Sequence, residues 1–478
     1  MPTAEPIPVR NPRTGAVDCS ITAPTETELD AVCARLREGQ AAWAAMPLAG
    51  RVAALRDWAQ AITRRAAQIA AQEELDTGRH QLSLQVPHMV AGSIQGWCDK
   101  APEILRQAHL SGTSSIYPTV QYETQLVPYP LLGVISPWNH PFLLSMIDAI
   151  PALLAGCAVV VKPSEVTPRF IAPVMESIAE VPALAAVLQY VAGDGRTGRR
   201  IIDRVDALCF TGSIATGRQV AVACAERFIP VFLELGGKDA AIVTASADLD
   251  RAATAVTRAS VFATGQICFS TERVYVHASV HDAFVARLVE RSNALAFTYP
   301  DPRQGQIGPF IFERQVGIVD EHIDDALARG ARLVAGGKSR VLGGGHYMPA
   351  TVLVDVTHDM KIMREETFGP VTPVMRYETE EEAVRLANDS AYGLSAAVIA
   401  GDVDEARRLG RQLEAGGISL QDAAITIAIL RDAEKNSFKF SGLGGSRMGP
   451  NGLLRFLRKK AFMINSAFPA DLAAGATH

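Results

Sequence analysis

Between residues 131 and 235 the chain repeats one pattern, in which a short apolar run is followed by a helical stretch. Each run is rich in β-branched residues and lacks alternating polar residues, which is typical of parallel strands buried on both faces. Regular alternation of strand and helix predicts a doubly wound α/β domain. The predicted strands are 132–136, 158–161, 187–191, 207–210 and 231–235.

A second series of apolar runs predicts a second α/β domain. Residues 117–129 fit neither series, because polar and apolar residues alternate there and no helix follows, so we expect an antiparallel excursion. Near the N-terminus, Thr25 with Glu26 and Glu28 predicts a capped helix to about Met46, and 48–72 predicts one further helix. The strands predicted for the second domain are 240–243, 273–276, 332–333, 371–374 and 396–399.

Composition excludes several classes of protein. The 478 residues suffice for two or three domains, and a net charge of -5 argues against nucleic acid or an anionic membrane as a partner. Seven cysteines without a Cys-x-x-Cys pair favour a reducing, cytoplasmic location without disulfides. The ten histidines do not cluster as metal ligands do, so we expect no metal. Residues 1–15 lack a signal-peptide core, and the longest apolar run, 149–161, is too short to span a bilayer.

Two peptides carry candidate catalytic groups. Cys268 follows Gly265-Gln266-Ile267, and a glycine nearby lets ligands approach the thiol closely. A lone cysteine is usually a small buried hydrophobe, but a thiolate is a strong nucleophile and a good leaving group. Glu234 lies between leucines and before Gly236-Gly237. A carboxylate in that apolar setting accepts a proton more readily than one in water, which makes Glu234 a candidate general base.

These two peptides, in this order, resemble the signature of the NAD(P)-dependent aldehyde dehydrogenase superfamily, and further peptides extend the resemblance over about residues 10–460. The resemblance implies that Cys268 is the nucleophile and that Glu234 activates water. It also implies that the Asn139 amide and the Cys268 N–H stabilise an oxyanion. Without the resemblance, Asn139 would be read as a turn residue between Pro137 and Pro141.

The same resemblance assigns the cofactor site. Lys162 and Glu165 follow a predicted strand, where they could form a surface ion pair or reach the adenosine ribose. A carboxylate at Glu165 repels a 2′-phosphate, which favours NAD over NADP. Gly193–Gly198 matches G-x-G-x-x-G by letter, which alone is weak evidence, and the resemblance implies that this loop borders the adenine pocket. The remaining assignments are Gly212 and Ser213 for the pyrophosphate, Glu366 for the nicotinamide ribose, and Phe368 and Trp138 beside the cofactor.

For the fold, the resemblance implies a Rossmann-like doubly wound cofactor domain, a second α/β catalytic domain and a small antiparallel β oligomerisation element. A homodimer or homotetramer is expected. The expected ranges are 1–113 and 129–235 for the cofactor domain, 236–437 for the catalytic domain, and 114–128 with 438–478 for the oligomerisation element.

The chain departs from the family pattern in three places. The usual Pro-Phe-Gly-Gly is replaced by Glu434-Lys435-Asn436-Ser437, in a loop that lies near the substrate mouth in relatives. Residues 418–422 lack the usual asparagine. His140 stands where the family often has an aromatic residue, and we assign it no catalytic role.

The expected reaction is oxidation of an aldehyde to its acid with NAD, through a thiohemiacetal and a thioester on Cys268. Leu143, Leu144 and Ile147 stand where relatives line the substrate pocket, and relatives specific for succinate semialdehyde carry an arginine in place of Ile147. An apolar or aromatic aldehyde is therefore expected. The alternatives are a CoA-acylating semialdehyde dehydrogenase, whose members commonly lack the base, and a non-catalytic structural protein on the same fold.

Overall fold

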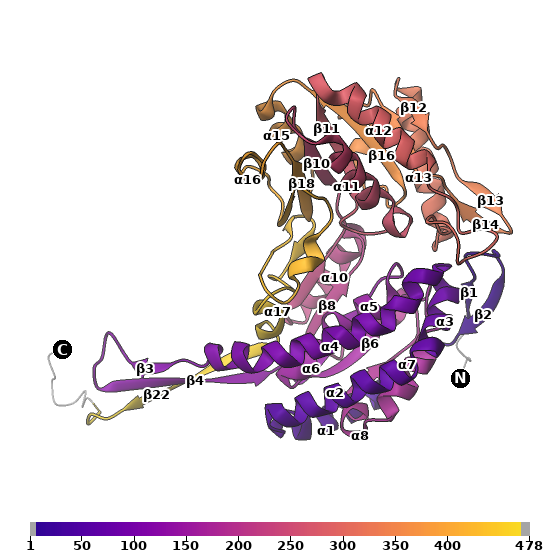
Figure 1. Cartoon of the computed structure of the whole chain (residues 1–478). Coiled ribbons are helices and arrows are strands. Elements are labelled where there is room, and N and C mark those ends of the chain that lie inside the picture. Colours follow the sequence, from indigo (N-terminus) through magenta and orange to yellow (C-terminus); the bar gives the residue numbers. More distant parts are fainter. Residues whose placement is uncertain (1–5, 470–478) are drawn as a thin grey trace.

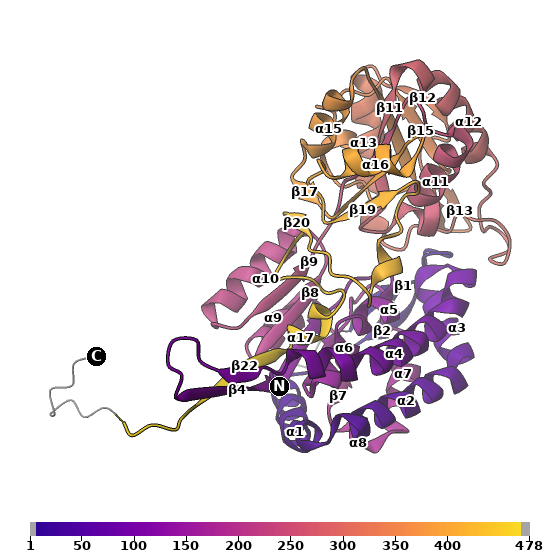
Figure 2. The same cartoon turned by 60° about the vertical axis from the view of Figure 1, so that its left-hand side comes forward.

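The computed structural model describes residues 6–469 and shows two lobes, with a long arm leaving the lower lobe (Figure 1). Each lobe is built on its own β-sheet, and the arm is a smaller sheet. The last segments of the chain, coloured orange to yellow, run from the upper lobe back to the lower lobe and the arm (Figure 2). Residues 1–5 and 470–478, which belong to the ranges expected for the cofactor domain and the oligomerisation element, lie outside the described residues.

The lower lobe contains a six-stranded sheet in the order β21-β9-β8-β5-β6-β7. From β9 to β7 the strands are parallel, and the order reverses between β5 and β8, as in doubly wound folds. The short β21 pairs antiparallel to β9. The strands are β5 (Leu131–Ile135), β6 (Ala158–Lys162), β7 (Leu188–Tyr190), β8 (Ala207–Thr211), β9 (Val231–Glu234) and β21 (Gly442–Leu443).

Helices cover this sheet, and one core cluster joins them to it. Helix α1 contacts β5, β6 and β7, whereas α9 and α10 contact β5, β8 and β9. The hairpin β1 (Ile7–Arg10) and β2 (Val17–Ile21) lies at the edge of the lobe. The helices are α1 (Glu26–Ala45), α2 (Leu48–Arg64), α3 (Ala66–Thr77), α4 (His80–Ala108), α5 (Pro141–Met146), α6 (Ala149–Ala155), α7 (Ile171–Ala179), α8 (Pro182–Ala185), α9 (Gly195–Ile202), α10 (Ile214–Glu226) and α17 (Asn451–Leu454).

The upper lobe contains a seven-stranded sheet in the order β12-β15-β16-β11-β10-β18-β19, parallel except for β12. Successive residues of one strand enter different core clusters: Ala240 and Ile242 belong to one, Ala241 and Val243 to the other. Both faces are therefore buried, which explains the unbroken apolar runs in the sequence. The strands are β10 (Asp239–Val243), β11 (Thr271–His277), β12 (Arg332–Ala335), β15 (Thr351–Val354), β16 (Val371–Tyr377), β18 (Ser395–Ile399) and β19 (Gly417–Leu420).

Helices and small hairpins complete the upper lobe. The hairpin β13 (Arg340–Leu342) and β14 (Gly345–Tyr347) extends from its edge, and β17 (Tyr392–Gly393) pairs with β20 (Phe438–Lys439). The helices are α11 (Leu249–Val261), η1 (Phe262–Gly265), η2 (Ala278–Val280), α12 (His281–Asn293), α13 (Glu313–Ala328), α14 (Lys361–Arg364), α15 (Glu380–Asn388), α16 (Val403–Gly410) and η3 (Thr426–Ile429).

The arm consists of β3 (Ser111–Thr113), β4 (Val120–Pro128) and β22 (Leu457–Asn465), all antiparallel. This is the antiparallel excursion expected over 117–129. Two strands of the range expected for the oligomerisation element pair elsewhere: β20 with β17, and β21 with β9 of the lower sheet. The sequence does not separate them from the arm, because both are only two residues long.

The expected α/β class is confirmed, with local differences. Thr25 begins α1 with a capping box to Glu28. The single helix predicted over 48–72 is wrong, because Arg65 leaves helical geometry between α2 and α3 and binds Glu176 and Glu180 beside α7. Within residues 6–469, no helix is long and apolar enough to cross a membrane.

Candidate active site

The two sheets meet where β9 of the lower lobe leads into β10 of the upper lobe. Glu234 ends β9, Asp239 begins β10, and Cys268 lies just before β11, the parallel neighbour of β10. The junction therefore brings the carboxyl ends of lower strands against the amino ends of upper strands. In doubly wound sheets, ligands bind at the carboxyl ends, near the point where the strand order reverses.

The backbone before Cys268 forms an unusual turn. Ala263, Thr264 and Gly265 have φ angles of 52°, 61° and 66°, so three consecutive residues are left-handed. A left-handed residue other than glycine costs about 1–3 kcal/mol, and such strain persists where the surroundings hold it. Here Arg79 donates a 2.6 Å hydrogen bond to the Ala263 carbonyl. The turn therefore fixes the conformation of the backbone that leads to Cys268.

Asn139 is tied to the same peptide. Its side-chain Nδ2 donates to the carbonyl oxygen of Gln266 at 2.9 Å, two residues before Cys268. Its own carbonyl oxygen accepts a 2.8 Å hydrogen bond from Arg79, the side chain that also binds Ala263. Arg79 thus positions the Asn139 loop and the Cys268 turn relative to one another, a role that the sequence did not indicate.

The thiol of Cys268 is half-buried. Burial raises the pKa of Cys268 to about 12; Glu366 and Asp239 add to the rise, whereas Lys435 and Arg447 oppose it. The thiol therefore keeps its proton at neutral pH in the free protein. A reactive thiolate requires a base or a positive charge close to the sulfur.

Glu234 is 8% exposed at the end of β9. Its backbone pairs with Thr211 on one side and with Gly442 on the other, which holds the residue in the sheet. Its Oε2 accepts a 2.7 Å hydrogen bond from the Ser437 hydroxyl. The leucines on either side are buried as expected, but the carboxylate itself has a polar partner.

The peptide after Glu234 touches the peptide of Cys268. A β-carbon on Gly237 would lie 2.2 Å from the carbonyl oxygen of Cys268, so the two backbones meet only because residue 237 lacks a side chain. This contact brings the base and nucleophile peptides together at the junction.

A buried ion pair supports a third peptide beside them. Lys238 donates to Glu272 at 2.7 Å, and the same carboxylate accepts the backbone N–H groups of Thr367 and Phe368 at 2.7 and 2.8 Å. The carboxylate of Glu272 thereby holds the segment that carries Glu366 and Phe368. In the sequence Lys238 is followed by Asp239 and Glu272 by Arg273, so no local pattern distinguishes this pair.

Comparison with known proteins decides the family, since a profile described as "Aldehyde dehydrogenase family" matches residues 1–462. The chain belongs to the aldehyde dehydrogenase family. A solved structure described as a putative aldehyde dehydrogenase PutA from Anabaena variabilis has a TM-score of 0.95 and 50% identity, covering 98% of this chain and 99% of that one.

Two curated relatives are similar at lower identity. A protein named 4,4'-diapolycopene aldehyde oxidase from Methylomonas sp is 36% identical, over 87% of this chain and 77% of its own length. A protein named putative succinate-semialdehyde dehydrogenase, with NADP(+) in its name, comes from Mycolicibacterium smegmatis. It is 35% identical over 98% of this chain and 90% of its own length.

The residues predicted to hold the cofactor of this aldehyde dehydrogenase lie at the carboxyl ends of β5, β6 and β8. Lys162 is 4% exposed and donates to the half-exposed Glu165 at 3.0 Å, so the two form an ion pair in the free protein. Ser213 caps α10 by accepting the Thr216 N–H, and Gly212 lies against the Phe210 ring. The weak Gly193–Gly198 match contains Asp194, whose carboxylate already accepts the first amides of α9.

The aromatic and acidic residues expected beside the nicotinamide lie close to the junction. The Trp138 ring packs edge-on against Phe368, with 5.3 Å between ring centroids. Glu366 accepts the Gly237 N–H at 3.1 Å, and burial, with the charge of Glu272, raises the pKa of Glu366 to about 8. His140 stays neutral, because burial and the charge of Arg79 lower its pKa to about 3.

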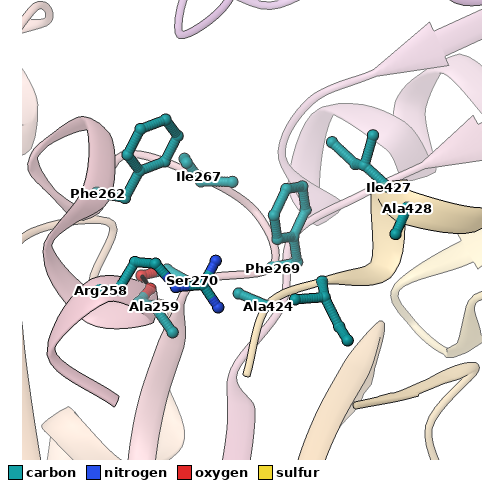
Figure 3. Close-up of a pocket in the computed structure, with 10 residues that line it drawn as sticks. Arg258, Ala259, Phe262, Ile267, Phe269, Ser270, Ala424, Ile427 and Ala428 are labelled. Carbon is teal, nitrogen blue, oxygen red and sulfur yellow. Dashed lines mark hydrogen bonds between the residues drawn. The ribbon is translucent and has the colours of Figure 1, made fainter. Parts of the chain in front are cut away.

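An apolar cavity of about 320 Å³ is lined by the two residues on either side of Cys268, but not by Cys268 itself. Ile267 and Phe269, the neighbours of Cys268, line it together with Phe262, and the segment 424–428 lines the opposite side (Figure 3). Arg258, at its edge, donates to Asp422 at 2.6 Å. Leu143, Leu144 and Ile147 are not among the residues that line this cavity, and Leu143 packs against the lower core.

Proposed function

We propose that this aldehyde dehydrogenase oxidises an apolar or aromatic aldehyde to the carboxylic acid, with NAD as hydride acceptor. The observation that carries the proposal is the convergence of three groups at the junction of the lobes. Asn139 binds the peptide of Cys268 directly, and the peptide of Glu234 touches the same backbone through Gly237. A nucleophile, an oxyanion donor and a base so placed are the parts that acyl transfer through a thioester requires.

In the first half-reaction, Cys268 Sγ attacks the aldehyde carbon and forms a thiohemiacetal. The Asn139 amide and the Cys268 N–H donate hydrogen bonds to the oxygen that becomes negative. NAD, when bound, would accept the hydride that leaves this carbon. Loss of the hydride converts the thiohemiacetal to a thioester. Burial raises the pKa of the thiol, so the sulfur must give up its proton as the carbon–sulfur bond forms, and water accepts that proton.

In the second half-reaction, Glu234 takes a proton from water, and the water oxygen attacks the thioester carbonyl. The carbon–sulfur bond then breaks, the acid leaves, and Cys268 is restored. Glu234 suits this step because it is nearly buried at the junction. A CoA-acylating enzyme would not need such a base, so the presence of Glu234 favours hydrolysis.

The carboxyl edge of the lower sheet suits a dinucleotide. Helix α10 follows β8 directly, and the first N–H groups of a helix have no partner within it, which favours a phosphate there. Lys162 and Glu165 are close enough to share ribose hydroxyls after their mutual ion pair opens. We assign NAD rather than NADP because the Glu165 carboxylate would repel a 2′-phosphate.

The cavity beside Cys268 supports the substrate class. Its walls carry phenylalanine, isoleucine and alanine side chains, and the Arg258 guanidinium that lines it is engaged by Asp422. Ile425, Ile427 and Ile429 are exposed around η3 at its mouth. Burial of an alkyl or aryl group stabilises binding by about 25 cal/mol per Å².

We also propose that the arm mediates a cytoplasmic homodimer or homotetramer. β22 exposes Phe462, Met463 and Ile464, and β4 exposes Tyr122, which would be covered in an oligomer. Light scattering on the intact protein, and on a variant with Met463→Glu and Ile464→Lys, would test this assembly.

A panel of aldehydes with NAD, followed by NADH absorbance, tests the proposed reaction. Apolar and aromatic aldehydes should yield one acid per NADH without added CoA. A strict need for CoA, or no turnover with any aldehyde, would contradict the proposal.

A further inference from the structure

We infer that Ser437 and Lys435 are positioning residues for Glu234, which hold its carboxylate ready for hydrolysis of the thioester. The inference rests on the proposed function and adds to it two residues of the segment 434–437, where this chain departs from its family. The Ser437 side chain is not needed to form the thioester, so Ser437 should affect one half-reaction only.

The hydrogen bonds run in one direction. The Lys435 ammonium donates to Ser437 Oγ at 3.3 Å, and Ser437 Oγ donates to Glu234 Oε2 at 2.7 Å. A hydroxyl has one proton and two lone pairs, so it can accept from an ammonium while it donates to a carboxylate. The charge of Lys435 therefore fixes the orientation of the Ser437 hydroxyl toward Glu234.

Lys435 is buried beside Ser437 and is held by several hydrogen bonds. Its residue is 8% exposed, its Nζ also donates to the Leu394 carbonyl at 3.2 Å, and its backbone N–H donates to Ser446 at 3.1 Å. A buried ammonium is costly unless hydrogen-bonded, so its placement points to a use for the charge. Lys435 is also one of the two cations that oppose the rise in the Cys268 thiol pKa, so its charge acts at the same junction.

The backbone around Ser437 is held on both sides. A β-carbon on Gly442 would lie 2.7 Å from the Ser437 Cβ, and Gly442 pairs with Glu234 in the sheet. A β-carbon on Gly416 would lie 1.5 Å from the carbonyl oxygen of Asn436. Ser437 thus faces Glu234 from a fixed distance, which positioning of a catalytic group requires.

Arg447 is a second cation whose charge acts on Glu234. Burial works to lower the pKa of Arg447, but the carboxylates of Asp148 and Glu234 outweigh it and raise that pKa. The Arg447 guanidinium is engaged by Asp148 and Thr211, each at 2.7 Å. It supplies charge without a direct hydrogen bond to Glu234, so Ser437 remains the group that orients the carboxylate and leaves Oε1 to take the proton from water.

The test separates the two half-reactions by stopped flow. Ser437→Ala should form about one NADH per active site at the wild-type rate and then turn over about 10- to 100-fold more slowly, the loss expected for one hydrogen bond to a charged group. Ser437→Thr keeps the hydroxyl and should restore turnover to within about threefold. Lys435→Met should slow the same phase, and it should also slow the first NADH because it removes a charge that opposes the rise in the Cys268 pKa. The matched control is Lys439→Met, which should behave as wild type; Lys439 lies on β20, two residues after Ser437, and binds the Asn388 carbonyl and Glu414.

Glu234→Gln, measured in parallel, distinguishes failure of this inference from failure of the proposed function. If Glu234→Gln stalls after one NADH while Ser437→Ala keeps wild-type turnover, the inference is wrong and the proposed function stands. If Ser437→Ala slows the first NADH and later turnover equally while Glu234→Gln slows only the later turnover, the serine has a structural role only and the inference is wrong. If Glu234→Gln itself does not stall, the proposed function fails first.

Discussion

The backbone of Gly237 lies against the carbonyl oxygen of Cys268, so closely that a β-carbon at residue 237 would stand 2.2 Å from that oxygen. The contact joins the peptide of the candidate base to the peptide of the candidate nucleophile. No flexible side chain can move aside to relieve an added methyl group, because the obstacle is backbone. The geometry of the site therefore depends on a residue with no functional group.

Gly237→Ala should lower kcat by about 100-fold, because displacing reacting groups by about 1 Å can cost that factor. Gly317→Ala, at a helical position where a β-carbon meets open space, is the control and should leave activity unchanged. NADH formation and thermal melting of both variants would be measured. Wild-type kcat in a folded Gly237→Ala would show that the contact does not position Cys268.

The sequence predicted the strands well where burial on both faces imposes an unbroken apolar run, as at β6 and β10. It missed β15, whose place depends on its pairing with β12 and β16. The catalytic residues were found from short peptides read beside a family resemblance. The sequence did not predict hydrogen bonds between residues far apart in the chain. Arg79 and Ala263 are 184 positions apart, and Ser437 and Glu234 are 203 positions apart. Such pairs are made by packing of the two lobes, which no local pattern encodes.

Alkylation of Cys268 by iodoacetamide should accelerate about tenfold per pH unit between about pH 7 and 9, without a plateau. Burial raises the pKa of the thiol to about 12, and only the thiolate reacts, so the reactive fraction still grows throughout this range. Mass spectrometry of the peptide that contains Cys268 would follow the rate in the free protein. A plateau below pH 9 would mean that the site already stabilises the thiolate.

NAD should give a higher kcat/KM than NADP, and Glu165→Gln should narrow the difference by relieving repulsion of the 2′-phosphate. Lys162 would be left without its ion-pair partner and could attract that phosphate. Glu290→Gln, which removes an exposed charge from α12, controls for net charge. Equal kcat/KM for the two cofactors in the wild type would count against this role of Glu165.

Benzaldehyde and hexanal should give higher kcat/KM than succinate semialdehyde, because the Arg258 guanidinium that lines the cavity is already paired with Asp422 and is not free to bind a substrate carboxylate. Ile427→Arg adds a guanidinium at the mouth of the cavity and should improve succinate semialdehyde selectively. Succinate semialdehyde is a useful test substrate, because one relative is named a putative succinate-semialdehyde dehydrogenase. A preference of the wild type for succinate semialdehyde would show that the cavity is not the substrate site.

Cys268 and Glu234 should act in separate steps. Cys268→Ala removes the group that forms the thioester, so no NADH should appear. Glu234→Gln keeps the volume and a hydrogen-bonding end but cannot accept a proton, so it should form about one NADH per site and then slow by about 10²–10⁴-fold, the range for loss of a general base. Stopped flow would resolve the two phases.

Mass spectrometry of the stalled Glu234→Gln enzyme should find the acyl group on Cys268. If Glu234 also removes the thiol proton, the first NADH will form slowly at neutral pH and faster as the pH rises, because the raised pKa of Cys268 leaves little thiolate at neutral pH. Turnover after the burst should stay slow at every pH, since water still lacks its base. An adduct on another cysteine, or wild-type turnover by Glu234→Gln, would refute the assignment of roles.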